Sequence, residues 1–208
     1  MDRITFAPIV AILLGYLIGS IPVGLVVGRI RGVDPRMVGS GRTGGTNVYR
    51  AAGPAAGIIT AVLDTLKGAV AVALVRILFP GVPLAAALAA LAAVVGHNWS
   101  LFLRFRGGAG TMTNLGNLLI LFWPIFVIAG LLGLATLYFS RMSSLASLVV
   151  AWGAAVLFIL FALLGSAPPA FIVYGIGQAL LITWSLRPNI RRIRAGTERR
   201  VGEHGAGH

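Results

Sequence analysis

The chain has 208 residues, of which 58% are hydrophobic and only 11% are charged. This composition excludes an ordinary soluble domain and favours a membrane protein, because each membrane-crossing helix needs about 20 mostly apolar residues. There are 17 lysines and arginines against five acids, a net charge of +12, and no cysteine, which excludes disulfide and thiol chemistry. The cations cluster at the ends of apolar segments, so we attribute them to membrane topology and attraction to anionic lipid, and not to nucleic-acid binding.

The first apolar segment, 5–28, is interrupted by Gly-Ser-Ile-Pro at 19–22. It is longer than the apolar region of a cleavable signal, so we predict a retained membrane helix. A proline inside such a helix frees a carbonyl group and kinks the rod, and polar neighbours or water can satisfy the freed group. Arg29, Arg31 and Arg36 follow the segment. They predict that this end lies in the cytoplasm and the amino terminus outside.

The glycine-rich stretch 39–50 (Gly-Ser-Gly-Arg-Thr-Gly-Gly-Thr-Asn-Val-Tyr-Arg) is unlike the apolar sequence around it. Its glycines let backbone N–H groups approach a ligand closely, and its hydroxyl and amide side chains add neutral donors. Arg42 and Arg50 add cations with planar donor forks. Glycine, hydroxyl and arginine without an acid is the composition of a phosphate-binding loop. The alternative is an ordinary cytosolic turn between two membrane helices.

Two further crossings are predicted at 55–79 and 82–103. Asp64 and Lys67 lie within the first of them, three residues apart on one helix face, so we expect them to pair. The pair is either functional or a buried ion pair that fixes helix packing. His97, near the end of the second, is either a general base or a structural side chain.

The apolar stretch 111–139 can form one crossing or two. If the chain turns back near Pro124, a short helix at about 109–122 is followed by a second at about 125–140, and Arg141 returns to the cytoplasm. We choose the turn, because it keeps the basic residues in the cytoplasm and because the short helix carries polar side chains.

The last two crossings are predicted at 144–165 and 168–186, followed by a basic tail, 187–208. We therefore predict an all-α integral membrane protein of about seven transmembrane helices, with the amino terminus outside and the carboxyl terminus in the cytoplasm. Residues 1–186 would form a single membrane domain. The tail would be a short cytoplasmic appendage, disordered from Gly202 onward.

Four polar clusters converge on the cytoplasmic side in this topology: 39–50, 96–98 with 104–113, 141–147 and 187–194. Several arginines at one depth need a counter-anion or water, so the clusters predict a site for an anionic headgroup that opens between helices able to admit an acyl chain. The sequence has no histidine–aspartate acyltransferase pair, no Gly-x-Ser-x-Gly motif, no Walker loop and no carboxylates at metal-site spacing. Any catalysis would therefore depend on positioning and electrostatic stabilisation.

Several short motifs follow one another along nearly the whole chain. The first region consists of Gly19-Ser20-Ile21-Pro22, Gly39-Ser40-Gly41, Gly44, Thr46-Asn47-Val48 and Arg50. The second consists of Asp64 with Leu66-Lys67-Gly68, Gly96-His97-Asn98, Phe105 with Gly107-Gly108 and Gly110, and Thr113 with Leu115-Gly116. The later regions are Ser144-Leu145-Ala146-Ser147 and Asn189-Ile190 with Ala195-Gly196-Thr197-Glu198. In this order, the motifs resemble those of the bacterial acyl-phosphate-dependent glycerol-3-phosphate acyltransferases (PlsY family).

The resemblance implies an enzyme of phospholipid biosynthesis in the bacterial plasma (inner) membrane, with seven helices and an active site facing the cytoplasm. Such an enzyme moves an acyl group from acyl phosphate to the first hydroxyl of glycerol 3-phosphate, giving lysophosphatidic acid and phosphate, with no metal or other cofactor. The implied catalytic residues are Ser40, Arg50, Ser144 and Asn189. The implied substrate- and phosphate-binding residues are Gly39, Gly41, Arg42, Gly44, Thr46, Asn47, His97, Gly107, Gly108 and Thr113.

The chain departs from the family pattern at several of the expected positions. Ala109 stands where the family has a lysine, and Leu186 where it has a histidine. Pro188 replaces a glutamate, and Arg42 an asparagine. Our hypothesis is that Arg42 supplies the cation lost at Ala109, with Thr111 adding a hydroxyl group.

Two other functions remain open at this point. Losing one charge-assisted phosphate contact costs roughly 2–4 kcal/mol, so the chain could be a catalytically silent or substrate-shifted relative that binds phosphorylated lipid or glycerol phosphate. The third possibility is a small transporter or flippase. A transporter would need polar side chains that continue to the outer face of the membrane. The helix ends expected there carry almost no polar side chain except Arg76, which makes this the weakest of the three functions.

Overall fold

The protein is built from α-helices joined by short loops, and this computed structural model contains no strand in the residues that it describes, 3–202. The helices are α1 (Arg3–Ser20), α2 (Val23–Ile30), α3 (Gly45–Ala52), α4 (Pro54–Leu78), α5 (Pro83–Asn98), α6 (Thr111–Leu121), α7 (Trp123–Ser140), α8 (Ser143–Leu163), α9 (Ala170–Ser185) and α10 (Arg187–Arg194). Two single-turn helices, η1 (Pro35–Met37) and η2 (Leu101–Leu103), lie in the connections. Residues 203–208, most of the stretch in which we expected disorder, lie outside the described residues.

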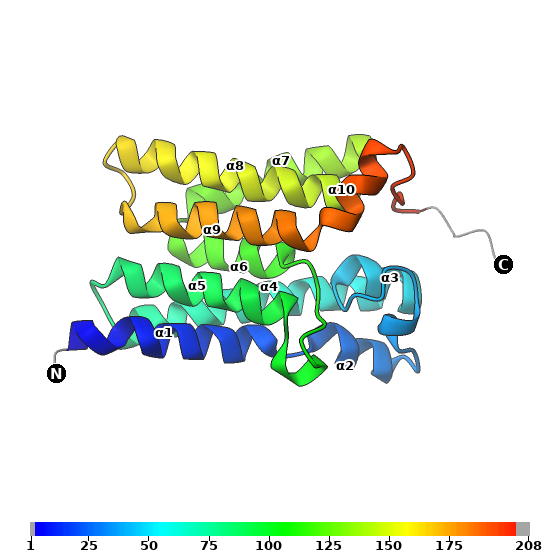
Figure 1. Ribbon diagram of the computed structural model, residues 1–208, viewed down its shortest axis with the longest axis horizontal. Helices are drawn as coiled ribbons and strands as arrows, with labels where there is room; N and C mark the ends of the chain where they lie inside the picture. Colours follow the sequence, from blue (N-terminus) through cyan, green and yellow to red (C-terminus); the bar gives the residue numbers. More distant parts are fainter. Residues whose placement is uncertain (1–2, 203–208) are drawn as a thin grey trace.

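The long helices lie along one common axis and successive ones run in opposite directions (Figure 1). α1 begins at one end of the bundle, and α2, α3 and α10 gather at the other end (Figure 1). Among the described residues, five segments are long and apolar enough to cross a membrane: Phe6–Ile30, Pro54–Leu78, Pro83–Leu103, Trp123–Ser140 and Ser143–Leu163. α9 with α10, bent by 66°, makes a sixth if the pair is counted as one span.

The chain breaks between α6 and α7, where Pro124 led us to expect a turn. α6 ends at Leu121 and α7 begins at Trp123. With 11 residues, α6 is roughly 16 Å long, about half the thickness of the hydrocarbon core. Our expectation of about seven crossings counts α6 as one of them. Length and composition alone do not identify α6 as a membrane span.

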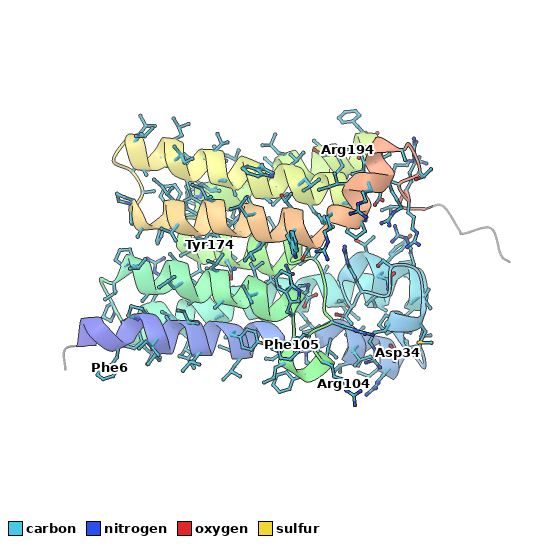
Figure 2. All side chains as sticks on the ribbon, in the orientation of Figure 1. Phe6, Asp34, Arg104, Phe105, Tyr174 and Arg194 are labelled. Atoms are coloured by element: carbon cyan, nitrogen blue, oxygen red, sulfur yellow. The ribbon has the colours of Figure 1, made fainter. Side chains whose placement is uncertain are left out.

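Buried polar side chains hold α6 in the middle of the bundle. Asn117 Nδ2 donates hydrogen bonds to the carbonyl oxygen of Ala90 in α5 (2.8 Å) and to Tyr174 Oη in α9 (3.1 Å). The Tyr174 hydroxyl in turn donates to Asn114 Oδ1. Figure 2 shows Tyr174 inside the bundle, whereas Phe6 lies on its surface near the start of α1. In an apolar interior such hydrogen bonds fix helix positions, because no water can replace a lost partner.

The interruption predicted at 19–22 is present and its free backbone groups are satisfied by side chains. α1 ends at Ser20 and α2 begins at Val23. The carbonyl oxygen of Ser20 accepts a hydrogen bond from Ser100 Oγ (2.6 Å), and that of Ile21 accepts one from Lys67 Nζ (3.0 Å). The break is therefore a built element of the fold, repaired from α4 and from the loop after α5.

α1 and α5 pack with their backbones in contact. A Cβ atom added at Gly15 would overlap the carbonyl group of Ala89, and one added at Gly19 would overlap that of Ala93. Small residues at a membrane helix interface permit this approach, since helices in lipid associate through close packing.

Candidate functional site

A cavity of ≈ 210 Å³ lies among α3, α4, α6, α7, α8 and α10. The four residues that we expected to be catalytic, Ser40, Arg50, Ser144 and Asn189, all line it. They come from three separate parts of the chain, which meet at this cavity. Their chemical roles stay predictions.

Asn47, at the start of α3, organises the glycine-rich loop in front of the cavity. Its Oδ1 accepts a hydrogen bond from the backbone N–H of Ser40 (2.9 Å). Its Nδ2 donates to the carbonyl oxygens of Pro35 (2.7 Å), Val38 (3.0 Å) and Arg42 (2.8 Å). Gly39 has φ 59°, and a Cβ there would overlap Asn47 Oδ1, so only glycine fits. This buried amide thereby holds Ser40 and Arg42 at the cavity.

The tail folds back over the cavity and brings a carboxylate into it. Gly196 (φ 70°) turns the chain after α10, and the backbone N–H of Val201 donates to the carbonyl oxygen of Arg141 (2.7 Å). Glu198 Oε1 then accepts hydrogen bonds from Ser144 Oγ (2.7 Å) and Asn189 Nδ2 (2.7 Å).

Glu198 is the centre of this hydrogen-bond network. Its Oε2 accepts a hydrogen bond from Arg192 Nε (2.8 Å). All three partners of the carboxylate, Ser144, Asn189 and Arg192, line the cavity. Burial would raise the pKa of the Glu198 carboxyl, but the hydrogen bonds from Asn189, Ser144 and Arg192 outweigh it and hold the pKa below its ordinary value. The carboxylate is therefore ionised at neutral pH and fixes the orientation of Ser144 and Asn189.

Arg42 completes the network from the opposite side. Its Nη1 donates to Asn189 Oδ1 (3.1 Å), and its Nη2 donates to the carbonyl oxygen of Ser185. Ala109, where the family has lysine, lines the same cavity. Arg42 therefore stands in the cavity where our hypothesis requires a cation.

The cavity carries an excess of positive charge. Its lining includes Arg42, Arg50, Arg192 and Arg199. Burial, together with nearby arginines, lowers the pKa of Arg42 and of Arg50, although a guanidinium group remains charged at neutral pH. Glu198 is the only acid among these lining residues apart from Asp64, which has its own partner. Four guanidinium groups against one available carboxylate leave a net positive charge that favours an anionic ligand.

Asp64 and Lys67 pair as predicted, at 2.7 Å between Oδ1 and Nζ. His97 Nδ1 lies 3.4 Å from the same oxygen. A Cβ atom at Gly108 would overlap His97 Nε2, and the N–H of Gly108 donates to the His97 carbonyl oxygen (3.0 Å). His97 and Asp64 reach the cavity, but their packing is that of a buried structural cluster linking α4 to α5.

The predicted binding residues divide into two groups. Arg42, Gly44, Thr46, Asn47 and His97 line the cavity, whereas Gly39, Gly41, Gly107, Gly108 and Thr113 do not. Gly107 and Gly108 pack the loop against the end of α5. Thr113 is fully buried, and its carbonyl group faces Gly68 of α4.

The sequence predicted an opening that could admit an acyl chain, but it identified none of the residues of the apolar half of the cavity. Its lining continues between α7 and α8 along Gly130, Gly133, Leu134, Leu137 and Val150. A Cβ at Gly130 would meet no atom within 4 Å, so there is open space beside it. The site therefore joins a basic, hydroxyl-rich half to an apolar half that can hold a hydrocarbon chain.

Several known proteins are similar to this chain over nearly its whole length. The family model described as glycerol-3-phosphate acyltransferase matches residues 9–196. The glycerol-3-phosphate acyltransferase of Rubrobacter xylanophilus is 42% identical over 203 residues, covering 96% of this chain and 98% of that protein. Glycerol-3-phosphate acyltransferase 2 of Moorella thermoacetica is 44% identical over 201 residues, covering 94% and 98%.

Two solved structures are similar over nearly their whole length. Both are crystal structures of PlsY (YgiH), an integral membrane glycerol 3-phosphate acyltransferase. The glycerol 3-phosphate form gives a TM-score of 0.85 at 33% identity, covering 94% of this chain and 96% of that one. The lysophosphatidic acid form gives 0.82 at 31% identity, covering 93% and 94%.

Proposed function

The chain belongs to the glycerol-3-phosphate acyltransferase family, and on that premise we propose that it transfers an acyl group from acyl phosphate to glycerol 3-phosphate. The products would be lysophosphatidic acid and inorganic phosphate. The observation that carries the proposal is the central cavity, in which a basic half meets an apolar half. Two phosphorylated substrates need such cations, and a fatty acyl chain needs such walls.

In the proposed reaction the hydroxyl oxygen of glycerol 3-phosphate bonds to the acyl carbon while the bond from that carbon to the phosphate oxygen breaks. The phosphate leaves with the electron pair and takes up the hydroxyl proton. We assign Ser40 and Arg50 to phosphate binding, and Ser144 and Asn189 to the reacting groups. Catalysis would consist of positioning and of stabilising charge on phosphate and carbonyl oxygens.

The protein is an all-helical integral membrane protein, and we propose seven crossings with the amino terminus outside. Support comes from the alternating direction of successive helices and from the gathering of α2, α3 and α10 at one end of the bundle (Figure 1). All three helices carry arginine. That end, with the cavity, would face the cytoplasm at the bacterial plasma (inner) membrane. Residues 1–186 would form the membrane domain and 187–208 the cytoplasmic tail.

Two rival functions compete with this proposal. A small transporter is not favoured, because the chain belongs to a family of acyltransferases. A silent relative that only binds glycerol phosphate or phosphorylated lipid would have the same cavity. Only a measurement of acyl transfer can therefore distinguish it from an enzyme.

The test uses purified protein in detergent with acyl phosphate and glycerol 3-phosphate. We expect release of phosphate that requires glycerol 3-phosphate and matches the lysophosphatidic acid formed, and we expect Arg50→Ala to abolish both. Arg31→Ala, at an exposed position beyond α2, serves as the matched control and should retain activity. Tight binding of glycerol 3-phosphate by the folded protein, with no turnover, would reject the enzyme in favour of the silent relative.

A further inference from the structure

A second hollow lies on the outside of the bundle, between α5 and α9, and ends at α10. It is a groove of ≈ 780 Å³ that shares no lining residue with the central cavity. Its walls are mainly apolar and include Leu91 of α5 and Leu180 and Leu181 of α9. Leu180 is 55% exposed, so this wall faces the side of the bundle that a membrane would cover.

One end of the groove carries three arginines. Arg187, Arg191 and Arg194 all line it and recur at intervals of four and three residues, so they share one face of α10. Asn189 and Arg192 lie on the other face and line the central cavity. Figure 2 shows Arg194 on α10, at the end of the bundle where the tail folds back.

These three cations have no acidic partner in residues 3–202. The acids of that range pair elsewhere: Asp34 with Arg36, Asp64 with Lys67, and Glu198 with Arg192. The Arg187 guanidinium carbon lies 4.3 Å from the centre of the Trp184 ring, and its Nη1 donates to the Trp184 carbonyl oxygen (3.1 Å). Arg187 is thus held at the mouth of the groove, where a guanidinium over an aromatic face is stabilised.

We propose that this groove binds one anionic phospholipid of the membrane. The phosphate would sit against Arg187, Arg191 and Arg194, and an acyl chain would lie along Leu91, Leu180 and Leu181. A cluster of cations at one membrane depth requires a counter-anion, and the apolar groove that continues from it selects a lipid over a soluble phosphate. Trp184 marks the polar–apolar boundary at which tryptophan is enriched. The inference does not depend on the reaction in the central cavity.

Trp184 lines the groove and provides the measurement. The chain has four tryptophans, and replacing Trp99, Trp123 and Trp152 by phenylalanine leaves it as the single emitter. The protein is reconstituted in vesicles of phosphatidylcholine and phosphatidylglycerol, with bromine, a contact quencher, on the chains of one lipid at a time. We expect brominated phosphatidylglycerol to quench Trp184 with a relative association constant about tenfold above that of brominated phosphatidylcholine.

Paired variants separate a site from general attraction to a charged surface. Arg191→Ala with Arg194→Ala should remove the preference. Arg29→Ala with Arg31→Ala deletes the same charge from two exposed positions at the end of α2 and should keep the preference. Equal quenching by the two lipids, or a preference that survives the Arg191 and Arg194 substitutions, would overturn the proposal.

A second measurement avoids the tryptophan substitutions. Native mass spectrometry of detergent-extracted protein counts the phosphatidylglycerol molecules that remain bound. We expect one retained molecule on the unmodified chain and on the Arg29 and Arg31 variant. We expect none on the Arg191 and Arg194 variant. The same count in all three proteins would refute the site.

Discussion

Replacing Arg42 by asparagine tests whether this guanidinium supplies the cation that Ala109 cannot. In the cavity Arg42 Nη1 lies 3.1 Å from Asn189 Oδ1, and Ala109 lines the same cavity. Losing one preorganised charge-assisted contact costs roughly 2–4 kcal/mol in the transition state, which is a fall in kcat/KM of about thirtyfold to nearly a thousandfold. The assay is phosphate release with acyl phosphate and glycerol 3-phosphate, each varied in turn.

The controls separate charge from folding. Arg42 also holds Asn189 and the Ser185 carbonyl group, so thermal melting in detergent must show that the variant is folded. Adding Ala109→Lys to Arg42→Asn returns a cation to the same cavity and should recover at least about tenfold of the lost rate. Arg31→Asn should leave activity unchanged. Full activity of Arg42→Asn would refute the assignment.

Three further predictions concern Glu198, Gly130 and Asp64. Hydrogen bonds hold the pKa of Glu198 below its ordinary value in the folded state. The contribution of the Glu198 carboxylate to the stability of the fold is therefore complete above about pH 4.5 and is lost as the pH falls through the folded-state pKa. The melting temperature should therefore differ between the unmodified chain and Glu198→Gln at pH 7, and the difference should shrink as the pH is lowered through the folded-state pKa; a difference that does not change with pH would contradict this. Gly130→Leu should raise KM for long-chain acyl phosphates more than for short ones, measured across a chain-length series, because it fills the open space in the apolar half; an equal change at every length would argue against an acyl path there. Asp64→Asn leaves Lys67 buried without its partner and should lower the free energy of unfolding by about 3–5 kcal/mol, measured by denaturant titration in detergent, whereas a neutral result would show that the pair is dispensable.

The helices and the approach of the polar clusters to one another could be predicted because a bilayer imposes two simple rules on the sequence, one on apolar length and one on the placement of charge. Apolar length identifies the helices, and arginines predict which helix ends face the cytoplasm. Pro124 and residues 19–22 marked the two breaks correctly, since proline removes a backbone donor wherever it occurs.

The place of Glu198 in the cavity and the residues of the apolar half could not be predicted from the sequence. A single carboxylate in a run of arginines has the pattern of a solvated tail. Its burial depends on the turn at Gly196 and on the long-range hydrogen bond from Val201 to Arg141. Gly130 lies in a helix that is apolar on every side, so periodicity does not distinguish its cavity face from its lipid face.

The break between α1 and α2 has a consequence for how the protein is made. The carbonyl groups of Ser20 and Ile21 receive their hydrogen bonds from Ser100 and Lys67, which follow 80 and 46 positions later in the chain. During synthesis the first segment therefore enters the bilayer before α4 and the loop after α5 have packed beside it and supplied these two hydrogen-bond donors. The amino-terminal quarter of the molecule can reach its final conformation only after the loop following α5 has emerged.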